Sequence, residues 1–210
     1  MTVNGSPVDL GRKVDPVADR IEVDGHLAAA DPESRYLMVN KPTGMVTTLD
    51  DPQGRPTIVE LIPEGPRVFP VGRLDMDSEG LLLLTNDGEL ANRLTHPRYG
   101  VEKEYLVEVE GTPNAKNLSA LRSGVDLDDG PARVLSIDVV GSSGQRTALR
   151  VVMGEGRKRE VRRLLDAVSH PVVRLVRVRL GTLRLEGVLP GEVRDLRPEE
   201  VRSLYEAAGL

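Results

Sequence analysis

A run of four leucines, Leu81–Leu84, constrains the fold more than any other segment of this 210-residue chain. Gly80 precedes the run, and the turn-forming residues Asn86-Asp87-Gly88 follow it closely. An apolar run this short, bounded by turn residues, is typical of a buried strand rather than of a helix. We therefore expect Leu81–Leu84 to lie inside a sheet. Asn86 is expected to cap a following helix, with Glu89 completing a capping box.

Strands and helices follow one another through the rest of the chain. Apolar patterning predicts strands at 36–40, 104–109, 132–140, 147–152 and 172–180. Helical periodicity predicts helices at 115–121, 158–169 and 198–207. Residues 50–66 are rich in Pro and Gly, which indicates a loop with one short helical turn. This order of elements, without an internal repeat, favours an α+β fold with a mixed, mainly antiparallel central sheet flanked by helices.

Positive charge is concentrated in one part of the chain. The net charge is −5, but residues 146–184 contain 11 Lys or Arg and 3 Asp or Glu, a local net of +8. Such a segment can bind a polyphosphate even in an acidic protein, because affinity depends on the local field and on counterion release. A solvated basic face is the alternative interpretation. Within the segment, Arg174, Arg177 and Arg179 alternate with apolar residues, which predicts a strand with one basic face.

Composition excludes several classes of site. The chain has no cysteine, so disulfides, thiolate metal sites and a cysteine nucleophile are all excluded. No apolar run reaches the roughly 18 residues that a membrane helix needs, and no segment resembles a signal peptide. We therefore expect a cytoplasmic protein that does not bind membranes. Five aromatic residues are too few for a platform that stacks several bases, but one flipped base against one ring is compatible with them.

An acidic cluster precedes the leucine run. Asp75, Asp77 and Glu79 alternate ahead of a glycine, which partly fits a calcium-binding loop. The pattern fails at its fifth and twelfth positions, so an acidic surface loop is the simpler alternative. Asp75, however, stands between two apolar segments, where a partly buried carboxylate needs a cationic partner. Arg73 and the basic cluster near residue 160 are the candidates.

A second charged segment, residues 154–159, follows a predicted strand and opens a helix. Gly-rich turns ahead of helices bind phosphate groups through backbone N–H groups, but this segment lacks the P-loop pattern. On the helix, Arg162 borders the apolar stripe and can therefore reach a buried carboxylate. Arg163 points away from the stripe, toward solvent or RNA. The three histidines have neither metal-ligand spacing nor a neighbouring nucleophile.

These motifs together resemble those of the RsuA/RluB family of ribosomal RNA pseudouridine synthases. The similarity rests on residues 40–46 (NKPTGMV), 72–88 (GRLDMDSEGLLLLTNDG), 103–105 (KEY) and 155–164 (EGRKREVRRL). It extends in order over roughly residues 35–200, and the long middle motif is highly specific. The large-subunit, RluB-like branch of the family is the more similar one.

The resemblance implies a role for each matching position. Asp75 matches the catalytic aspartate, Tyr105 the tyrosine that stacks on the target base, and Arg162 the basic residue that pairs with the aspartate. Arg73 matches the arginine beside the nucleophile and is expected to contact RNA. The further RNA contacts that the motifs imply are Lys41, Lys103, Arg157, Lys158, Arg159 and Arg163. For Lys41, a structural role in its turn is an equal alternative.

The implied reaction needs neither a cofactor nor a metal. The uridine is flipped out of its RNA context, its N-glycosidic bond is broken, and the base is rejoined through C5 to the same ribose carbon. Asp75 acts either by attacking the sugar carbon or by promoting loss of the base, and the sequence leaves both routes open. Tyr105 supplies an aromatic face and is a candidate for removing the C5 proton.

Residues 1–30 consist of short β-type runs separated by turn residues and are too short for a core of their own. They resemble the last part of an S4 RNA-binding domain, without the two helices that precede it in this family. We therefore expect a partial S4-like segment and linker at 1–30 and a monomeric catalytic domain at 31–210, acting on ribosomal RNA or a pre-ribosomal particle. The rival hypotheses are a non-catalytic RNA-binding assembly factor that has kept the fold and a metal-dependent nuclease built on Asp75 and Asp77.

Overall fold

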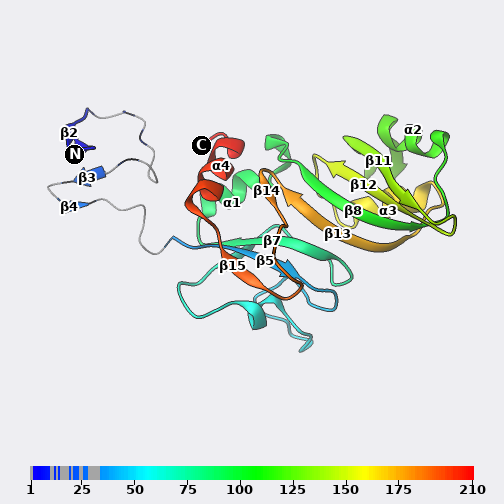
Figure 1. Ribbon diagram of the computed structural model, residues 1–210, viewed down its shortest axis with the longest axis horizontal. Helices are drawn as coiled ribbons and strands as arrows, with labels where there is room; N and C mark the ends of the chain where they lie inside the picture. Colours follow the sequence, from blue (N-terminus) through cyan, green and yellow to red (C-terminus); the bar gives the residue numbers. More distant parts are fainter. Residues whose placement is uncertain are drawn as a thin grey trace.

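A nine-stranded sheet dominates the part of the chain that the computed structural model describes, which is residues 2–9, 12, 14, 19, 21–23, 26–27 and 34–210 (Figure 1). Seven strands follow the order β11-β12-β8-β13-β7-β5-β15, while β14 pairs with β13 and β6 with β7. β13 and β7 run parallel, and the other strand pairs of this sheet are antiparallel. The strands span β5 Tyr36–Lys41, β6 Phe69–Val71, β7 Glu79–Thr85, β8 Lys103–Glu110, β11 Ser136–Ser142, β12 Arg146–Met153, β13 Val172–Leu180, β14 Leu183–Arg184 and β15 Val193–Asp195.

Helices lie at both ends of this sheet. Figure 1 shows α1 beside α4 near β14, with α2 and α3 at the β11–β12 end. The described helices are α1 Gly88–Thr95, α2 Ala115–Ser123, α3 Glu160–Ala167 and α4 Pro198–Ala208, with 3-10 helices η1 Ile58–Leu61 and η2 Pro97–Tyr99. This mixed, mainly antiparallel sheet with flanking helices confirms the predicted α+β class. Among the helices described, none has the length and apolar character needed to cross a membrane.

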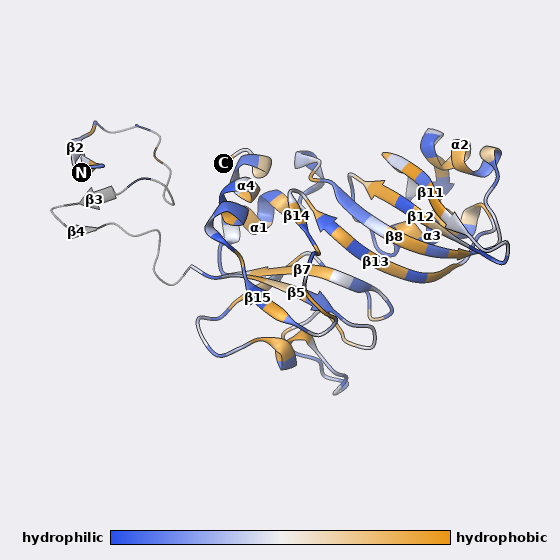
Figure 2. Cartoon of the chain, viewed as in Figure 1, coloured by the Kyte–Doolittle hydropathy of each residue, from blue (hydrophilic) through white to orange (hydrophobic). Residues whose placement is uncertain are grey.

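The leucine run forms the buried centre of β7, as predicted. All four leucines are 0% exposed. Leu82 and Leu84 belong to the core on one face of the sheet, whereas Leu81 and Leu83 belong to the core on the other. Successive side chains of a strand point to opposite faces, so an unbroken apolar run requires cover on both. Figure 2 shows this contrast, because β7 is almost continuously apolar while β13 alternates.

The helix after β7 is capped one residue later than predicted. Asp87 Oδ1 accepts a hydrogen bond from the Leu90 N–H at 3.0 Å, so Asp87 rather than Asn86 is the cap. Asn86 instead accepts a hydrogen bond from the Arg35 N–H at 2.8 Å. β7 continues to Thr85, which leaves Asn86 beside the neighbouring chain segment and moves the start of α1 to Gly88.

The strand predicted at 132–140 and the helix predicted at 158–169 differ most from the observed elements. The strand expected at 132–140 is divided, because Gly130–Ala132 (β10) pairs with Val125–Leu127 (β9) in a separate hairpin. Only β11 joins the central sheet. α3 begins at Glu160, two residues later than expected, since Arg159 adopts a left-handed conformation with φ of 51°.

A second, four-stranded sheet lies near the N-terminus, with the order β2-β1-β3-β4. Its strands are β1 Thr2–Val3, β2 Ser6–Pro7, β3 Ile21–Val23 and β4 His26–Leu27. Several residues between these strands lie outside the described part of the chain. The S4-like character of residues 1–30, and the boundary at 30/31, therefore stay predictions.

Candidate active site

Asp75 lies in the wall of a cavity of about 600 Å³ between the β6–β7 turn, the faces of β8 and β13, and the start of α3. The same cavity is lined by seven of the ten site residues predicted from the sequence: Arg73, Asp75, Lys103, Tyr105, Arg157, Lys158 and Arg159. Lys41, Arg162 and Arg163 are not part of its lining. The fold thus brings together residues from three separate motifs, and a volume of this size is typical of small-molecule sites.

Hydrogen bonds to five consecutive carbonyl oxygens fix the turn that carries Asp75. The pairs are Thr47 Oγ1 to Leu74 (2.7 Å), the Ser78 N–H to Asp75 (3.0 Å), the Gly44 N–H to Met76 (2.8 Å), Arg162 Nη2 to Asp77 (2.8 Å) and Lys41 Nζ to Ser78 (2.8 Å). Three of these donors come from residues 41–47, so the first sequence motif is a brace for the second. A turn held at every carbonyl presents its side chains in one geometry, which is what a catalytic group requires.

Lys41 is fully buried, with 0% of its surface exposed. Its ammonium donates hydrogen bonds to the carbonyls of Ser78 and Pro42, at 2.8 and 2.9 Å. Burial lowers the pKa of Lys41 to about 8, although the nearby carboxylates of the acidic turn oppose that shift. A side chain enclosed in this way cannot reach RNA. Lys41 therefore does not make the RNA contact predicted for it. It has the alternative, structural role in the turn.

The arginine nearest to Asp75 is Arg159, with Nη1 3.9 Å from Asp75 Oδ2. Arg159 also binds both carboxylate oxygens of Asp77, at 2.9 and 3.0 Å, and these hydrogen bonds lower the pKa of Asp77. The expected pairing of Arg162 with Asp75 is not observed. Arg162 Nη2 instead lies 3.4 Å from Asp77 Oδ2, and Nη1 donates to the Val172 carbonyl at 3.2 Å. Arg162 is buried between α3, the turn and β13, so it braces Asp75 indirectly.

One face of the sheet forms the inner wall of the cavity. Tyr105 is 8% exposed and lies opposite Arg177 in the antiparallel pairing of β8 with β13. Lys103 precedes Tyr105 by two residues and therefore points to the same face of β8. Lys103 Nζ donates a hydrogen bond to the Val101 carbonyl at 2.9 Å, and burial lowers its pKa. Lys103, Tyr105 and Arg177 thus form one contiguous patch.

Arg177 and Ser78 line the cavity but were not among the site residues predicted from the sequence. Arg177 was assigned to a basic face together with Arg174 and Arg179, but residues three apart on a strand point to opposite faces. Arg174 is exposed and binds both carboxylate oxygens of Glu79 at 2.9 Å, whereas Arg177 is 3% exposed and lines the cavity. Counting the two-residue period separates Arg177 from Arg174 but groups it with Arg179, which binds Glu102 and Glu104 instead because the pairing with β8 shifts register between Arg177 and Arg179.

Arg157 and Arg163 both make bonds that stabilise the protein, and of the two only Arg157 also lines the cavity. Arg163 binds both carboxylate oxygens of Asp129, at 2.8 and 3.0 Å. Arg157 contacts the same Asp129 at 3.2 Å, donates to the Pro131 carbonyl at 2.6 Å, and pairs with Glu160 at 3.2 Å. These bonds tie the β9–β10 hairpin to α3. Their expected RNA contacts stay predictions, although Asp129 already binds both guanidinium groups.

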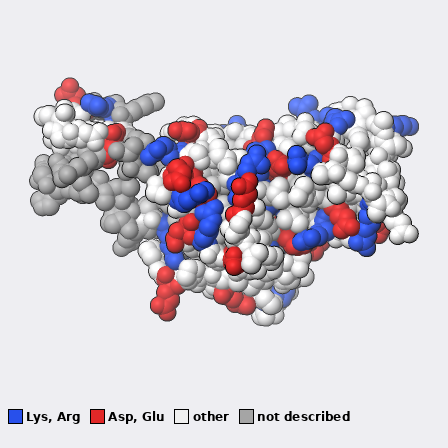
Figure 3. All heavy atoms as spheres, in the orientation of Figure 1, with Lys and Arg blue, Asp and Glu red and all other residues white. Residues whose placement is uncertain are grey.

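Positive charge on the surface is interspersed with negative charge. On the face seen in Figure 3, Lys and Arg side chains alternate with Asp and Glu rather than forming one basic patch. Many arginines of the +8 segment pair with carboxylates from elsewhere in the chain, as Arg174 does with Glu79. Arg73 and Lys158, both exposed at the cavity, have no ion pair within the described residues. They are the cations best placed to meet RNA phosphates.

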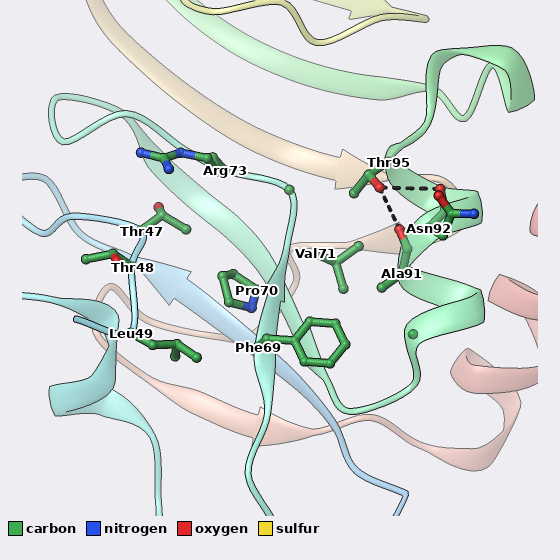
Figure 4. Close-up of a pocket in the computed structure, with 12 residues that line it drawn as sticks. Thr47, Thr48, Leu49, Phe69, Pro70, Val71, Arg73, Ala91, Asn92 and Thr95 are labelled. Carbon is green, nitrogen blue, oxygen red and sulfur yellow. Dashed lines mark hydrogen bonds between the residues drawn. The ribbon is translucent and has the colours of Figure 1, made fainter. Parts of the chain in front are cut away.

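A second hollow of about 590 Å³ adjoins the cavity (Figure 4). Figure 4 shows Thr47 and Leu49 on one side of it and Asn92 and Thr95, on α1, on the other. The two hollows share the wall formed by Val71, Gly72, Arg73 and Thr95. Arg73 therefore stands at the boundary between them, in a groove that continues past the catalytic cavity.

The Asp75–Asp77 pair is not arranged to bind a metal. Both carboxylate oxygens of Asp77 accept hydrogen bonds from Arg159, so this side chain is already neutralised. Among the described residues, no group of three or more His, Cys, Asp or Glu is placed to hold a metal ion. The contacts of Asp77 therefore argue against the nuclease hypothesis.

These features define a class of enzyme. Residues 35–167 match the family model of RNA pseudouridylate synthase, and this range contains the turn, Tyr105 and α3. The chain belongs to the RNA pseudouridylate synthase family. It is an RNA pseudouridine synthase, an isomerase.

Similar proteins show which branch of the family the chain resembles. It is 47% identical over 211 residues to an uncharacterized RNA pseudouridine synthase of Aquifex aeolicus, covering 99% of this chain and 84% of the relative. It is 40% identical over 209 residues to ribosomal large subunit pseudouridine synthase B of Bacillus subtilis, covering 96% and 84%. A crystal structure of a pseudouridylate synthase matches with a TM-score of 0.75 and 30% identity, covering 97% and 87%. The resemblance to the RluB-like branch is confirmed by these matches.

Proposed function

We propose that this enzyme converts uridine to pseudouridine in large-subunit ribosomal RNA, with Asp75 as its catalytic carboxylate. The observation that carries the assignment is the placement of Asp75 on a fully braced turn, facing a cavity whose inner wall contains Tyr105. The choice of large-subunit RNA is supported by the similarity to the Bacillus subtilis enzyme.

The cavity and its residues fit a flipped nucleoside. A uridine removed from its stack is held against the ring of Tyr105, while Asp75 faces the ribose. Arg159 Nη1 lies 3.9 Å from Asp75 Oδ2, so it places positive charge beside the carboxylate that either route of the reaction requires. Arg162 acts through the turn: it is a positioning residue that holds the Asp77 carbonyl and thereby the geometry of Asp75.

The reaction conserves every atom. In the first step the C1′–N1 bond breaks and its electron pair passes to the uracil, which becomes an anion. Asp75 achieves this either by bonding to C1′ or by taking up a ribose proton as the base leaves. The base then rotates and C5 bonds to C1′. In the first route the bond between Asp75 and C1′ breaks, and in the second Asp75 gives the proton back to the ribose. C5 loses a proton, for which Tyr105 is the candidate acceptor, and N1 gains one.

The RNA backbone meets the exposed cations at the mouth of the cavity. Arg73 and Lys158 have no competing ion pair among the described residues, so their charges are free to displace counterions from phosphates. We further propose that the enzyme acts as a monomer in the cytoplasm, on ribosomal RNA or a pre-ribosomal particle. The partial S4-like segment at 1–30 would add to RNA affinity without contributing to the reaction.

Mapping of pseudouridines in ribosomal RNA, from cells with and without this protein, tests the proposal. We expect a defined pseudouridine of the large-subunit RNA to disappear and to return with the wild-type gene but not with Asp75→Asn. Unchanged ribosomal RNA would contradict the assignment and support the non-catalytic assembly factor. Loss of a pseudouridine from small-subunit RNA would correct only the choice of subunit.

A further inference from the structure

Three buried polar side chains line the catalytic cavity with unused hydrogen-bonding capacity: Ser78, Lys103 and Arg177. They are 1%, 9% and 3% exposed, respectively. Ser78 Oγ and Arg177 Nη2 are shielded from solvent and have no hydrogen-bond partner. Lys103 uses one ammonium proton, toward the Val101 carbonyl. Buried polar atoms almost always have partners, so unpartnered ones in a cavity point to a ligand.

The two cations of this group are not balanced by a carboxylate. No Asp or Glu among the described residues lies within 4.0 Å of Lys103 or Arg177 as an ion pair. Burial and then the charge of Arg177 lower the pKa of Lys103, while the charge of Glu160 opposes this shift. Glu160 is itself engaged by Arg157, through its backbone N–H at 3.0 Å and its Nε at 3.2 Å. Unpaired buried cations are costly, so this wall of the cavity favours an electron-rich partner.

The backbone fixes the position of Arg177. Arg177 Nε donates a hydrogen bond to the Leu81 carbonyl at 2.7 Å, which holds the guanidinium against β7. A Cβ atom at Gly80 would lie 2.3 Å from the Arg177 carbonyl oxygen, so β7 and β13 approach each other closely at this point. Tyr105 is the cross-strand neighbour of Arg177. Because both residues line the same cavity, a base held against Tyr105 lies next to Arg177.

We propose that Ser78, Lys103 and Arg177 bind the carbonyl edge of the target uracil and hold the negative charge that the base acquires when the C1′–N1 bond breaks. This inference rests on the proposed function. Uracil presents two carbonyl acceptors, O2 and O4, on either side of the N3–H donor. Lys103 and Arg177 can only donate hydrogen bonds, and the Ser78 hydroxyl can donate or accept one. The group is therefore complementary to uracil.

The same chemistry selects against cytosine. Cytosine carries an amino donor in place of the O4 acceptor, and a donor facing Arg177 or Lys103 leaves buried donors unpaired. A phosphate is a poorer fit for this wall than a base. The RNA backbone stays at the mouth of the cavity, where Arg73 and Lys158 are exposed, whereas these three side chains are at most 9% exposed.

The proposal holds for either role of Asp75. Attack on C1′ and loss of the base both leave the bonding electron pair on the uracil, where it spreads over O2 and O4. Fixed donors aimed at these oxygens bind the anion more strongly than the neutral base, so they lower the barrier to bond breaking. Arg177 and Lys103 would thus contact the reacting base, while Ser78 orients it.

The test uses the purified full chain and a large-subunit RNA transcript labelled with tritium at C5 of uridine, since the reaction releases that tritium. We expect Arg177→Met to lower the single-turnover rate by about 100-fold or more, with the Kd for RNA changed by less than about threefold. Arg177→Lys should recover part of the rate, because it keeps one charged donor. Arg174→Met is the matched control on the opposite face of the same strand, and its rate should stay within about threefold of wild type.

Ser78→Ala keeps the test decisive if Arg177→Met fails to fold. The Ser78 hydroxyl has no partner, so removing it should leave the Tm unchanged or raise it while lowering the rate about tenfold. Replacing O4 of the mapped uridine with sulfur should slow the wild-type enzyme and have little further effect on Arg177→Met.

Wild-type rates in both Arg177→Met and Ser78→Ala would overturn the proposal. If Arg177→Met instead lowered the affinity for RNA and left the rate unchanged, Ser78, Lys103 and Arg177 would bind an RNA phosphate rather than the uracil, and the proposal would be wrong. Absence of tritium release by the wild-type protein would contradict the proposed function itself, which separates the two failures.

Discussion

Lys41 supports the active site from a position that no substrate reaches. Its ammonium holds the Ser78 carbonyl, and with the four neighbouring carbonyl contacts it fixes the turn around Asp75. A local pattern could identify the Asn-Lys-Pro-Thr-Gly motif but not its partner, because Ser78 is 37 residues away in the chain. Arg162 is also far in sequence from its partner, so the local pattern could not show that it binds Asp77 rather than Asp75.

Lys41 should make the stability of the protein depend on pH. Its pKa is about 8 in the folded state, against an ordinary lysine value of 10.5, so the unfolded state binds more protons between these values. The free energy of unfolding from this group therefore rises as pH increases through that window, and the penalty is fully present below about pH 8. We expect urea unfolding to show that the free energy of unfolding of the wild type increases between about pH 7.5 and about pH 9.5. Relative to Lys41→Met, this increase should be on the order of 1–3 kcal/mol. A pH-independent difference would contradict the assignment.

Arg159 and Arg162 should separate into two roles. Arg162→Met removes buried hydrogen bonds to the Asp77 and Val172 carbonyls, so we expect the free energy of unfolding to fall by about 2–4 kcal/mol. Arg159 is more exposed, and Arg159→Met should change stability by less than about 1 kcal/mol while still lowering the single-turnover rate. Thermal and chemical unfolding of the two variants measures these losses of stability. A larger loss of stability in Arg159→Met would exclude this division.

At the scale of elements, periodicity predicted most strands and helices, and errors arose where the backbone departs from regular geometry. The bounds of β13 at 172–180 were correct, and so were those of β8 and α4 to within one residue. The division of 132–140 depended on pairing with β9, which sequence patterning does not reveal. The late start of α3 depended on the left-handed conformation of Arg159. Arg177 was not predicted as a site residue because its charge was taken as a sign that it is exposed.

Gly80 should be irreplaceable at the contact between β7 and β13. Its φ is 104°, and a Cβ there would meet the Arg177 backbone at 2.3 Å. Gly80→Ala should therefore lower the free energy of unfolding by at least about 2 kcal/mol, roughly 5 °C in Tm, and also lower the rate, since Asp75 and Arg177 lie beside this contact. Gly88→Ala is the matched control, because a Cβ at Gly88 meets nothing within 4 Å; it should be neutral or stabilising by up to about 1 kcal/mol. Equal effects in the two variants would contradict the close approach.

For the whole molecule, the distribution of charge along the chain differs from its distribution in space. Residues 146–184 carry a net of +8, yet their arginines pair with Glu79, Glu104, Glu108 and Asp129 from other segments. The sequence could reveal the positive segment but not this neutralisation, which depends on the tertiary fold. Binding to RNA should accordingly depend on a few free cations at the cavity mouth rather than on a broad basic surface.

The salt dependence of RNA binding tests this picture. Arg73→Gln and Lys158→Gln should each reduce the slope of log Kd against log salt concentration by about 0.7–0.9, one phosphate contact apiece. Arg163→Gln should leave the slope unchanged, because Asp129 already neutralises that guanidinium. Filter binding or fluorescence anisotropy across a salt series gives the slopes. An effect of Arg163→Gln as large as that of Arg73→Gln would restore the basic-surface interpretation.

The central claim concerns Asp75, and one substitution tests it most directly. The purified wild-type and Asp75→Asn proteins are compared on large-subunit RNA labelled with tritium at C5 of uridine. Asn keeps the size of the side chain but removes the carboxylate, so folding and the Kd for RNA should be preserved. We predict that tritium release and pseudouridine formation fall to background in Asp75→Asn. Continued formation of pseudouridine by that variant would contradict the account of the active site.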